Sequence, residues 1–199
     1  MNPAFELSYW SFGLKLAQQW RERLGLPHVE KWDHVLRHLS TLPTKNGVYQ
    51  NAETALNTFE NAFNRNDHPT VLGAFGFLPN DSIDVSMMRK TLEKVMRSWN
   101  WERTWGWDYP LIAMTAARVG RPDQAVDALL MKVQKNTYLN NGHNYQDERL
   151  PIYLPGNGGL LTAVAMMAAG WEGAPDVRAP GFPKDGNWVV RYEGLKPLL

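Results

Sequence analysis

Apolar residues recur every three or four positions along most of this chain, and that spacing restricts the possible fold more than any other feature. The clearest case is a stripe of five apolar residues, Val85, Met88, Leu92, Val95 and Trp99, which share one side of an α-helix. An aspartate stands directly before this stripe, at position 84, where its side chain is well placed to cap the first turn. The pattern predicts a helix over 85–99 and an all-α class for the chain.

Similar patterns predict seven more helices, most of them joined by short turns. The first two, at 5–24 and 29–39, are separated by a very short loop and therefore form an antiparallel hairpin. The last, at 158–169, is apolar nearly all round and is expected to be buried on most sides. Because amphipathic and strongly apolar helices alternate, we expect two layers of helices rather than a simple four-helix bundle. The other predicted helices lie at 55–63, 71–78, 109–119 and 122–133.

The chain divides into a helical domain, 1–172, and a tail, 173–199. Proline and glycine are frequent in the first half of the tail, as is typical of an extended segment. A loose alternation of apolar and polar residues predicts a short strand at 187–192. Inside the helical domain, 41–52 carries turn signals, so we expect irregular structure there with a short strand at 48–50.

The composition excludes several classes of protein. Twenty-one basic and 20 acidic side chains give a net charge of +1, so there is no electrostatic reason to expect nucleic acid or an anionic membrane as a partner. No apolar run approaches the roughly 18–20 residues needed to span a bilayer, and we expect no membrane insertion. The sequence contains no cysteine, which excludes disulfides, thiolate zinc sites and cysteine nucleophiles.

Tryptophan is far above its usual share, with nine in the chain and four of them between positions 99 and 107. Sugar rings stack their apolar C–H faces on indoles, while their hydroxyls need carboxylates and indole N–H groups. The segment therefore predicts a carbohydrate site to which aromatic side chains and a carboxylate contribute. A hydrophobic plug between helix layers and a cage for a quaternary ammonium group are the alternatives. The expected sugar-binding residues are Trp101, Trp105, Trp107 and Tyr109, and Asp108 is expected to bind or catalyse.

A polar loop, 136–155, leads towards the last predicted helix and carries a second group of candidates. Asn141, His143 and Asn157 are expected to line the ligand site, because amide side chains and free backbone N–H groups at a helix start bind hydroxyls or anions. Capping of the helix by Asn157 is the alternative. Near the start of the chain, Asn2 and Trp10 are further candidates for substrate binding.

Glu6 falls in the first turn of the first predicted helix, where a carboxylate also favours the helix dipole. We expect Glu6 and Asp108 to act as acid and base, or to bind sugar hydroxyls. The histidines lack partners at a spacing typical of metal ligands. His34 and His38 are four residues apart, but a solvated helix face explains this pair better than a metal. We expect no metal site and no cofactor.

Three segments resemble a known group of proteins. They are 2–10 (NPAFELSYW), 101–108 (WERTWGWD) and 150–159 (LPIYLPGNGG). They resemble the C-terminal part of bacterial six-hairpin glycosidase-like proteins, a group described as family 65-like and distantly similar to the family 95 α-fucosidases. The likeness extends over essentially the whole chain.

The resemblance implies an (α/α)6 toroid of about twelve helices with a sugar site at its centre, of which this chain forms about half the ring. It leaves Glu6 and Asp108 as the candidate catalytic residues, with Asp147 and Glu148 as further candidates. Pro155 stands where the family 95 enzymes have a second catalytic carboxylate. The pair of carboxylates that inverting hydrolysis normally uses is therefore not visible in the sequence.

We accordingly expect a glycoside hydrolase-like protein that binds an oligosaccharide or glycoside at the toroid centre, as the C-terminal portion of a longer enzyme. A non-catalytic helical or carbohydrate-binding module is the alternative. The missing half of the toroid or a homo-oligomer is expected to cover the inner face. The expected location is periplasmic or extracellular if the chain belongs to a longer secreted enzyme, and cytoplasmic if it is complete as given.

Overall fold

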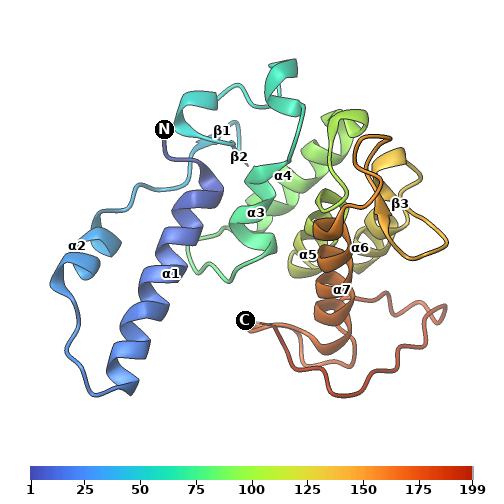
Figure 1. Ribbon diagram of the computed structural model, residues 1–199. Helices are drawn as coiled ribbons and strands as arrows, with labels where there is room; N and C mark the ends of the chain where they lie inside the picture. The colour runs from blue at the N-terminus through green and yellow to red at the C-terminus, as the bar shows by residue number, and fades with distance from the viewer. Residues whose placement is uncertain (199) are drawn as a thin grey trace.

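The structure, a computed structural model, describes residues 1–198 (Figure 1). Within them, α-helices make up most of the regular structure, and two pairs of two-residue antiparallel strands complete it. This confirms the mainly α class. The helices are α1 (Ala4–Arg23), α2 (Glu30–His38), α3 (Thr70–Gly76), α4 (Val85–Ser98), α5 (Asp108–Arg118), α6 (Pro122–Leu129) and α7 (Leu154–Ala169). The strands are β1 (Thr44–Lys45) with β2 (Val48–Tyr49) and β3 (Thr137–Tyr138) with β4 (Asn144–Tyr145).

The odd-numbered helices form one row. In this row α1 packs on α3, α3 on α5 and α5 on α7 (Figure 1). The even-numbered helices flank it, because α2 contacts α1, α4 contacts both α3 and α5, and α6 lies along α5. The inner members of the row, α3 and α5, therefore have a row neighbour on both sides, whereas α1 and α7 have one on a single side. Among residues 1–198, no helix has the length and apolarity that crossing a bilayer demands.

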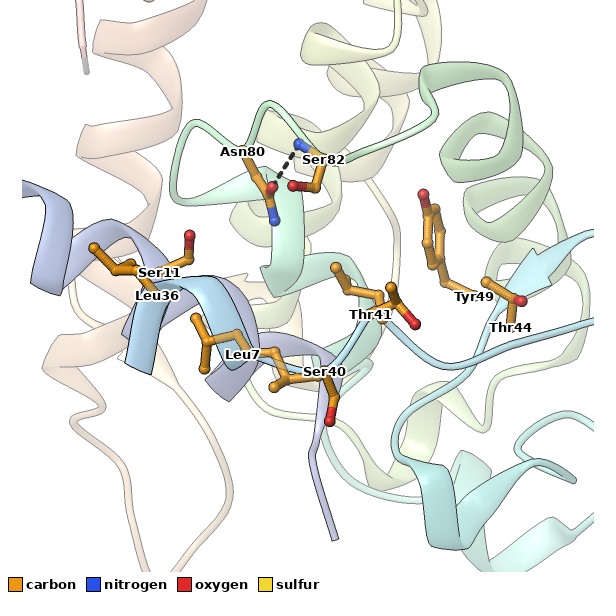
Figure 2. Close-up of a pocket in the computed structure, with 11 residues that line it drawn as sticks. Leu7, Ser11, Leu36, Ser40, Thr41, Thr44, Tyr49, Asn80 and Ser82 are labelled. Atoms are coloured by element: carbon orange, nitrogen blue, oxygen red, sulfur yellow. Dashed lines mark hydrogen bonds between the residues drawn. The ribbon is translucent and has the colours of Figure 1, made fainter. Parts of the chain in front are cut away.

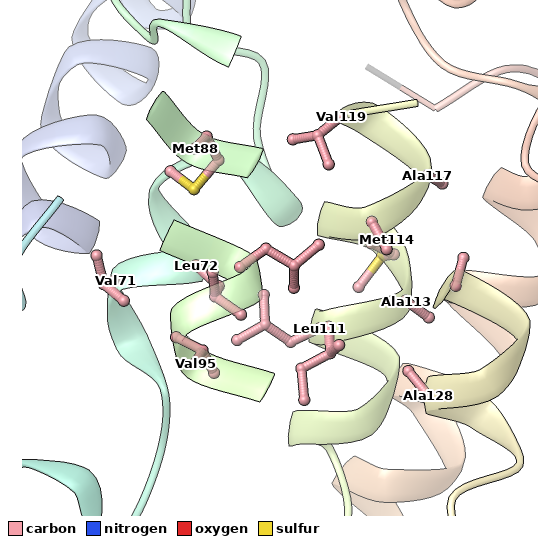
Figure 3. Packing of buried hydrophobic residues seen from close by; sticks show 14 of the residues in the cluster. Val71, Leu72, Met88, Val95, Leu111, Ala113, Met114, Ala117, Val119 and Ala128 are labelled. Carbon is pink, nitrogen blue, oxygen red and sulfur yellow. The ribbon is translucent and has the colours of Figure 1, made fainter. Parts of the chain in front are cut away.

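The core is centred on α5, in which every residue is buried. Leu111 and Met114 of this helix face Met88 and Val95 of α4 (Figure 3). A helix of small and apolar residues such as α5 has no polar face to turn to water, so it is stable only when other helices surround it. The helix α4 supplies a matching apolar side, and the buried part of its stripe runs from Met88 to Trp99.

The predicted cap of α4 is confirmed. The carboxylate of Asp84 accepts a hydrogen bond from the backbone N–H of Met87 at 3.0 Å, and so satisfies one of the free donors in the first turn. Val85, the first member of the predicted stripe, is exposed because it precedes the part of the helix that α3 and α5 cover.

The predicted α-helix over 55–63 is wrong. The structure has two short 3-10 helices there, Glu53–Ala55 and Ala62–Arg65, separated by turns. The cause is local hydrogen bonding by polar side chains, which competes with helix formation. Thr58 donates its hydroxyl to the carbonyl of Ala55 at 2.6 Å, and Asn61 accepts the N–H of Phe63 at 3.0 Å.

The last helix departs from its prediction in two ways. It begins at Leu154, four residues before the expected start, and it is not buried on most sides. Leu161 is 72% exposed, and Leu154 and Val164 are exposed with it. The opposite end of the row is similar, since α1 leaves Tyr9 and Trp20 exposed although both belong to its apolar stripe. The two ends of the row thus carry uncovered apolar side chains.

The tail contains no strand at 187–192. This segment is extended and mostly exposed, with Val189 82% exposed, and it has no partner strand. Alternation alone does not make a strand, since the backbone groups need a neighbour. The strand expected at 48–50 is found as β2, paired with β1. The helix expected at 122–133 ends at Leu129.

Candidate functional site

Two segments far apart in the sequence are joined just before α3 and α5. Arg65 donates a side-chain hydrogen bond to the carbonyl of Ser98 at 2.7 Å. The backbone N–H of Asn100 donates to the carbonyl of Arg65 at 3.1 Å, and its side-chain amide donates to Asn66 at 2.9 Å. These bonds hold the segment that leads into α3 against the tryptophan-rich loop that leads into α5.

His68 and Asp108 meet where these two segments join. Nδ1 of His68 lies 2.9 Å from Oδ1 of Asp108, and Oδ2 of Asp108 accepts the backbone N–H of Trp105 at 2.8 Å. The indole Nε1 of Trp107 also lies 3.0 Å from Nδ1 of His68. Because Nδ1 serves only one partner at a time, we assign its proton to the charged carboxylate, the stronger acceptor. Nε2, the other ring nitrogen of His68, lies 3.4 Å from Oδ1 of Asp67.

Burial and charge act in opposite directions on this pair. Asp108 has no exposed surface, and burial raises the pKa of its carboxyl, although the bonds from His68 and Trp105 lower it in part. Burial lowers the pKa of the His68 imidazole, but the hydrogen bond to Asp108 and the charges of Asp108 and Asp67 outweigh it, so this pKa is raised. The imidazole therefore holds a proton more strongly than a free histidine does.

Asp67 stands beside the pair in an unusual backbone conformation. Its φ of +74° lies in the left-handed region that residues other than glycine seldom adopt. Two indole N–H groups hold it there: that of Trp99 donates to its carbonyl at 2.8 Å, and that of Trp105 donates to its carboxylate at 2.7 Å. The side chain remains 66% exposed. Asp67 thus presents a fixed carboxylate at the surface.

A continuous series of aromatic contacts passes through this site, and we call it the aromatic strip. Neighbouring rings have centroids 4.8–6.1 Å apart, the range of favourable ring pairs. The rings come from every odd-numbered helix or from the loop next to it, so the strip crosses the whole row. In order from α1 to α7 its members are Tyr9, Phe5, Phe77, Trp107, His68, Trp105 and Tyr153.

The strip is accessible along its length. Tyr9 is 58% exposed, the His68 side chain is 26% exposed, and the other rings are half-buried. Phe77 and Trp107 stack nearly parallel, 4° apart, near its centre. A row of rings that is fixed on one side and open on the other is a platform on which a flat apolar face can stack.

Two buried amides support the tryptophan-rich loop from below. Gln146 accepts the N–H of Gly106 at 2.9 Å and donates to the carbonyl of Thr104 at 3.1 Å. Asn144 lies against Gly106 and Gly156, where a Cβ would come within 1.8 Å and 2.3 Å of its Oδ1. Both positions therefore require glycine. The polar loop thus sets the position of the rings above it.

The structure brings together three of the predicted site residues, Trp105, Trp107 and Asp108. The prediction that Asp108 acts directly on a sugar is corrected, since its side chain is fully buried and both oxygens are bonded, one to His68 and one to the N–H of Trp105. The prediction for Tyr109 is corrected as well. Its ring is fully buried and its hydroxyl is 2.7 Å from that of Thr104, so Tyr109 packs in the core. Trp101 packs on Tyr109 and on the core, outside the strip.

The predicted residues of the polar loop take structural roles in the described geometry. Asn157 accepts the N–H of Asn144 at 3.0 Å and donates to the carbonyl of Gly142 at 2.7 Å, which ties the loop to α7. Asn141 accepts the N–H of His143 at 3.1 Å and so closes a turn. Asp147 likewise accepts N–H groups of its own turn, while Glu148 is exposed.

The predicted residues of α1 lie apart from the His68–Asp108 pair. Asn2, with φ +49°, donates to the hydroxyl of Ser40 at 3.0 Å. Glu6 is exposed on the first turn of α1, next in sequence to Phe5 of the strip. Trp10 is 58% exposed. None of the three contacts Asp108, so the structure assembles no pair of catalytic carboxylates from Glu6 and Asp108 within residues 1–198.

A separate cavity of about 370 Å³ lies between α1, α2 and the loop before α4 (Figure 2). Hydroxyl groups, one amide and several leucines line this cavity, and none of the lining side chains is charged. No member of the aromatic strip lines it. Ser11, Ser40, Thr41, Thr44, Tyr49, Asn80 and Ser82 supply its polar groups.

Among the residues that the structure describes, no three histidine, aspartate or glutamate side chains lie close enough together to bind one metal ion. The rings of His34 and His38 stack 4.1 Å apart on an exposed face, as expected of a solvated pair. Two of the histidines have carboxylate partners in the folded chain. His28 pairs with Glu22 and with Asp33, and His68 pairs with Asp108.

Comparisons with protein-family models, with curated proteins and with solved structures find no match for this chain.

Sequence reasoning missed several residues of the site. Asp67 stands 38 positions from Trp105 and His68 stands 40 positions from Asp108, so no local spacing connects these pairs. One signal was available in the sequence. A polar residue followed by proline, His68–Pro69, stands at the start of an apolar helix, just as Asn2–Pro3 stands at the start of the first predicted helix. Phe5, Phe77 and Tyr153 were assigned to helix packing or left without a role.

Proposed function

We propose that this chain binds a carbohydrate along the aromatic strip, and that its row of helices is an arc of an (α/α)6 toroid of the glycosidase-like type. The observation that carries the proposal is the strip itself, a series of accessible rings with a histidine and two aspartates near its centre. Rings bind the C–H faces of sugars, and the polar groups between them bind hydroxyls.

The placement of the strip supports the toroid. At least one ring lies at or near the start of each odd-numbered helix: Phe5 in α1, His68 before α3, Trp107 before α5 and Tyr153 before α7. The starts of the four helices thus lie at the strip, and Phe77 joins it from the C-terminal end of α3. A toroid builds its ligand site in this way, from the loops at one end of neighbouring inner helices.

The uncovered ends of the row also support an arc. Leu154, Leu161 and Val164 of α7 and Trp10 and Trp20 of α1 are exposed, and large apolar side chains left uncovered in this way indicate contact with other protein. We propose that further helices cover these two ends, supplied by the remainder of a longer toroid or by a second copy of the chain.

Of the two activities expected from the sequence, the geometry favours carbohydrate binding over hydrolysis. Asp108 is enclosed, and Glu6 lies apart from it, so these two carboxylates do not flank a common space that a glycosidic bond could occupy. The accessible polar groups at the strip are the imidazole of His68 and the carboxylate of Asp67. We propose that these two groups orient the sugar hydroxyls over the rings.

The experiment is isothermal titration calorimetry of the protein with a panel of neutral and charged oligosaccharides. Trp105→Ala removes a central ring of the strip and should weaken binding by about 1.5 kcal/mol, or about tenfold. Trp188→Ala is the matched control, because Trp188 is 41% exposed in the tail and belongs to no part of the strip. Absence of binding to any member of the panel, or equal affinities for the two variants, contradicts the proposal.

A further inference from the structure

We infer that the carbohydrate bound by the strip carries a protonated amine, so that the site selects amino sugars over neutral and acidic ones. The inference rests on the proposed function and adds the chemical class of the ligand. Three features support it: the sign of the charge at the site, the accessibility of Asp67, and the hydrogen bond that joins this carboxylate to the strip at Trp105.

The charge at the centre of the strip is negative. The charges that act on Tyr153 come from Asp108 and Asp67, and the same two carboxyls act on His68. Within the described part of the chain, the only ion pair that either carboxyl makes is with His68. One imidazolium offsets one carboxylate, so a full negative charge remains when His68 is protonated and two remain when it is neutral.

The remaining charge is best assigned to Asp67. Asp108 has no exposed surface and two charge-assisted hydrogen bonds, whereas the Asp67 side chain is 66% exposed. Nε2 of His68 is 3.4 Å from Oδ1 of Asp67, the same oxygen that accepts the Trp105 indole N–H. Asp67 is therefore held at a fixed place and remains open to a cation from solvent.

The rings beside Asp67 place its charge within the strip. Trp105 donates its indole N–H to Asp67 and also contacts Tyr153, with ring centroids 5.6 Å apart. A ligand that pairs with Asp67 is therefore beside the edge of Trp105 and close to the rings of the strip. A neutral sugar stacked here would take the carboxylate partly out of water without a charge partner, which costs free energy. An acidic sugar would be repelled.

The test compares two ligands with the same sugar backbone, a glucosamine tetramer with protonated amines and its N-acetylated counterpart with neutral amides, titrated at mildly acidic pH. We expect the wild-type protein to bind the amine form about tenfold more tightly, the affinity ratio that corresponds to about 1.4 kcal/mol. Added salt should reduce that ratio because it screens the charge.

Two variants locate the preference. Asp67→Asn keeps an acceptor for Trp105 but removes the charge, and it should bring the ratio close to one by weakening the binding of the amine form most. Asp176→Asn removes an equal charge from an exposed position in the tail and should keep the wild-type ratio. Circular dichroism of both variants checks that the fold is retained.

The outcomes separate the two claims. Equal affinity of the wild type for the two tetramers overturns the amine preference and leaves carbohydrate binding standing. A preference that survives in Asp67→Asn overturns the role of Asp67. If neither the tetramers nor any other sugar binds, the proposed function fails, and the inference fails with it.

Discussion

Replacement of Asp108 by asparagine is the most informative single change, because the carboxylate holds both His68 and the tryptophan-rich loop. The two side chains have nearly the same shape, so packing is conserved while the charge is lost. One oxygen is replaced by an NH2 group, which cannot accept a hydrogen bond. Either the N–H of Trp105 or Nδ1–H of His68 then loses its acceptor in a site with no exposed surface.

The expected loss follows from these two bonds. An unsatisfied buried donor costs about 1–3 kcal/mol, and exchange of a charged acceptor for a neutral one costs about 1 kcal/mol more. Relief of the desolvation that raises the Asp108 pKa offsets part of this. We therefore expect Asp108→Asn to lower the free energy of unfolding by about 2 kcal/mol, which lowers Tm by roughly 4–8 °C for a chain of this size.

The effect depends on pH with a definite sign. The pKa of His68 is raised above 6.5 in the folded state, so its contribution to stability is full below that value and is lost as pH rises through the raised pKa. The variant should therefore fall furthest below the wild type near about pH 6 and approach it under alkaline conditions. Its His68 pKa should fall, because the carboxylate that raised it is gone while burial remains.

Urea unfolding followed by tryptophan fluorescence measures the first quantity, and NMR titration of the imidazole C–H signals measures the second. Asp176→Asn, an exposed aspartate in the tail, controls for the loss of one negative charge. If Asp108→Asn lowers the free energy of unfolding by less than about 0.5 kcal/mol and leaves the His68 pKa unchanged, the pairing of His68 with Asp108 is refuted.

Two further predictions concern the supports around the site. Gly106→Ala places a Cβ 1.8 Å from the buried Asn144 amide, so we expect a loss of about 2–3 kcal/mol in urea unfolding and a shift of the loop tryptophan signals. His28 bonds to Glu22 and Asp33, and both bonds raise its pKa above 6.5. The contribution of His28 to folding stability is therefore present below pH 6.5 and is lost as the pH rises through the raised pKa. The urea midpoint of His28→Gln should accordingly approach that of the wild type as the pH becomes alkaline.

Each of these predictions has a control in the chain. Gly158→Ala meets no atom within 4 Å and lies inside α7, so it should be neutral or slightly stabilising. An equal loss at both glycines would contradict the contact with Asn144. His38→Gln removes a histidine that has no carboxylate partner among the described residues, and its midpoint should follow the wild type across pH. If His28→Gln does the same, the bridge to Glu22 and Asp33 does not act in solution.

Local patterns predicted most of the helices because their causes are local. The stripe of α4 and its Asp84 cap were visible in the sequence, and the structure has both. The errors arise where contacts between distant residues decide. The stripe of α7 says nothing about what covers it, and the alternation at 187–192 does not reveal that the segment has no partner strand.

The site was only half predictable for the same reason. The aromatic density of 101–109 singled out Trp105 and Trp107, but density alone did not separate them from Tyr109, which turns into the core. Asp108 was visible as a carboxylate among indoles. Its imidazole partner, His68, is supplied by the packing of α3 on α5, and a spacing of 40 residues carries no local signal.

The central claim, that the strip binds carbohydrate, is tested most directly by the indole N–H signals of the nine tryptophans in an NMR titration with the best-binding oligosaccharide. The account predicts that the signals of Trp105 and Trp107 shift progressively and saturate. The signals of Trp20, Trp171 and Trp188 should stay in place. A titration that moves the tail or α1 signals, while those of Trp105 and Trp107 remain unchanged, would contradict the account.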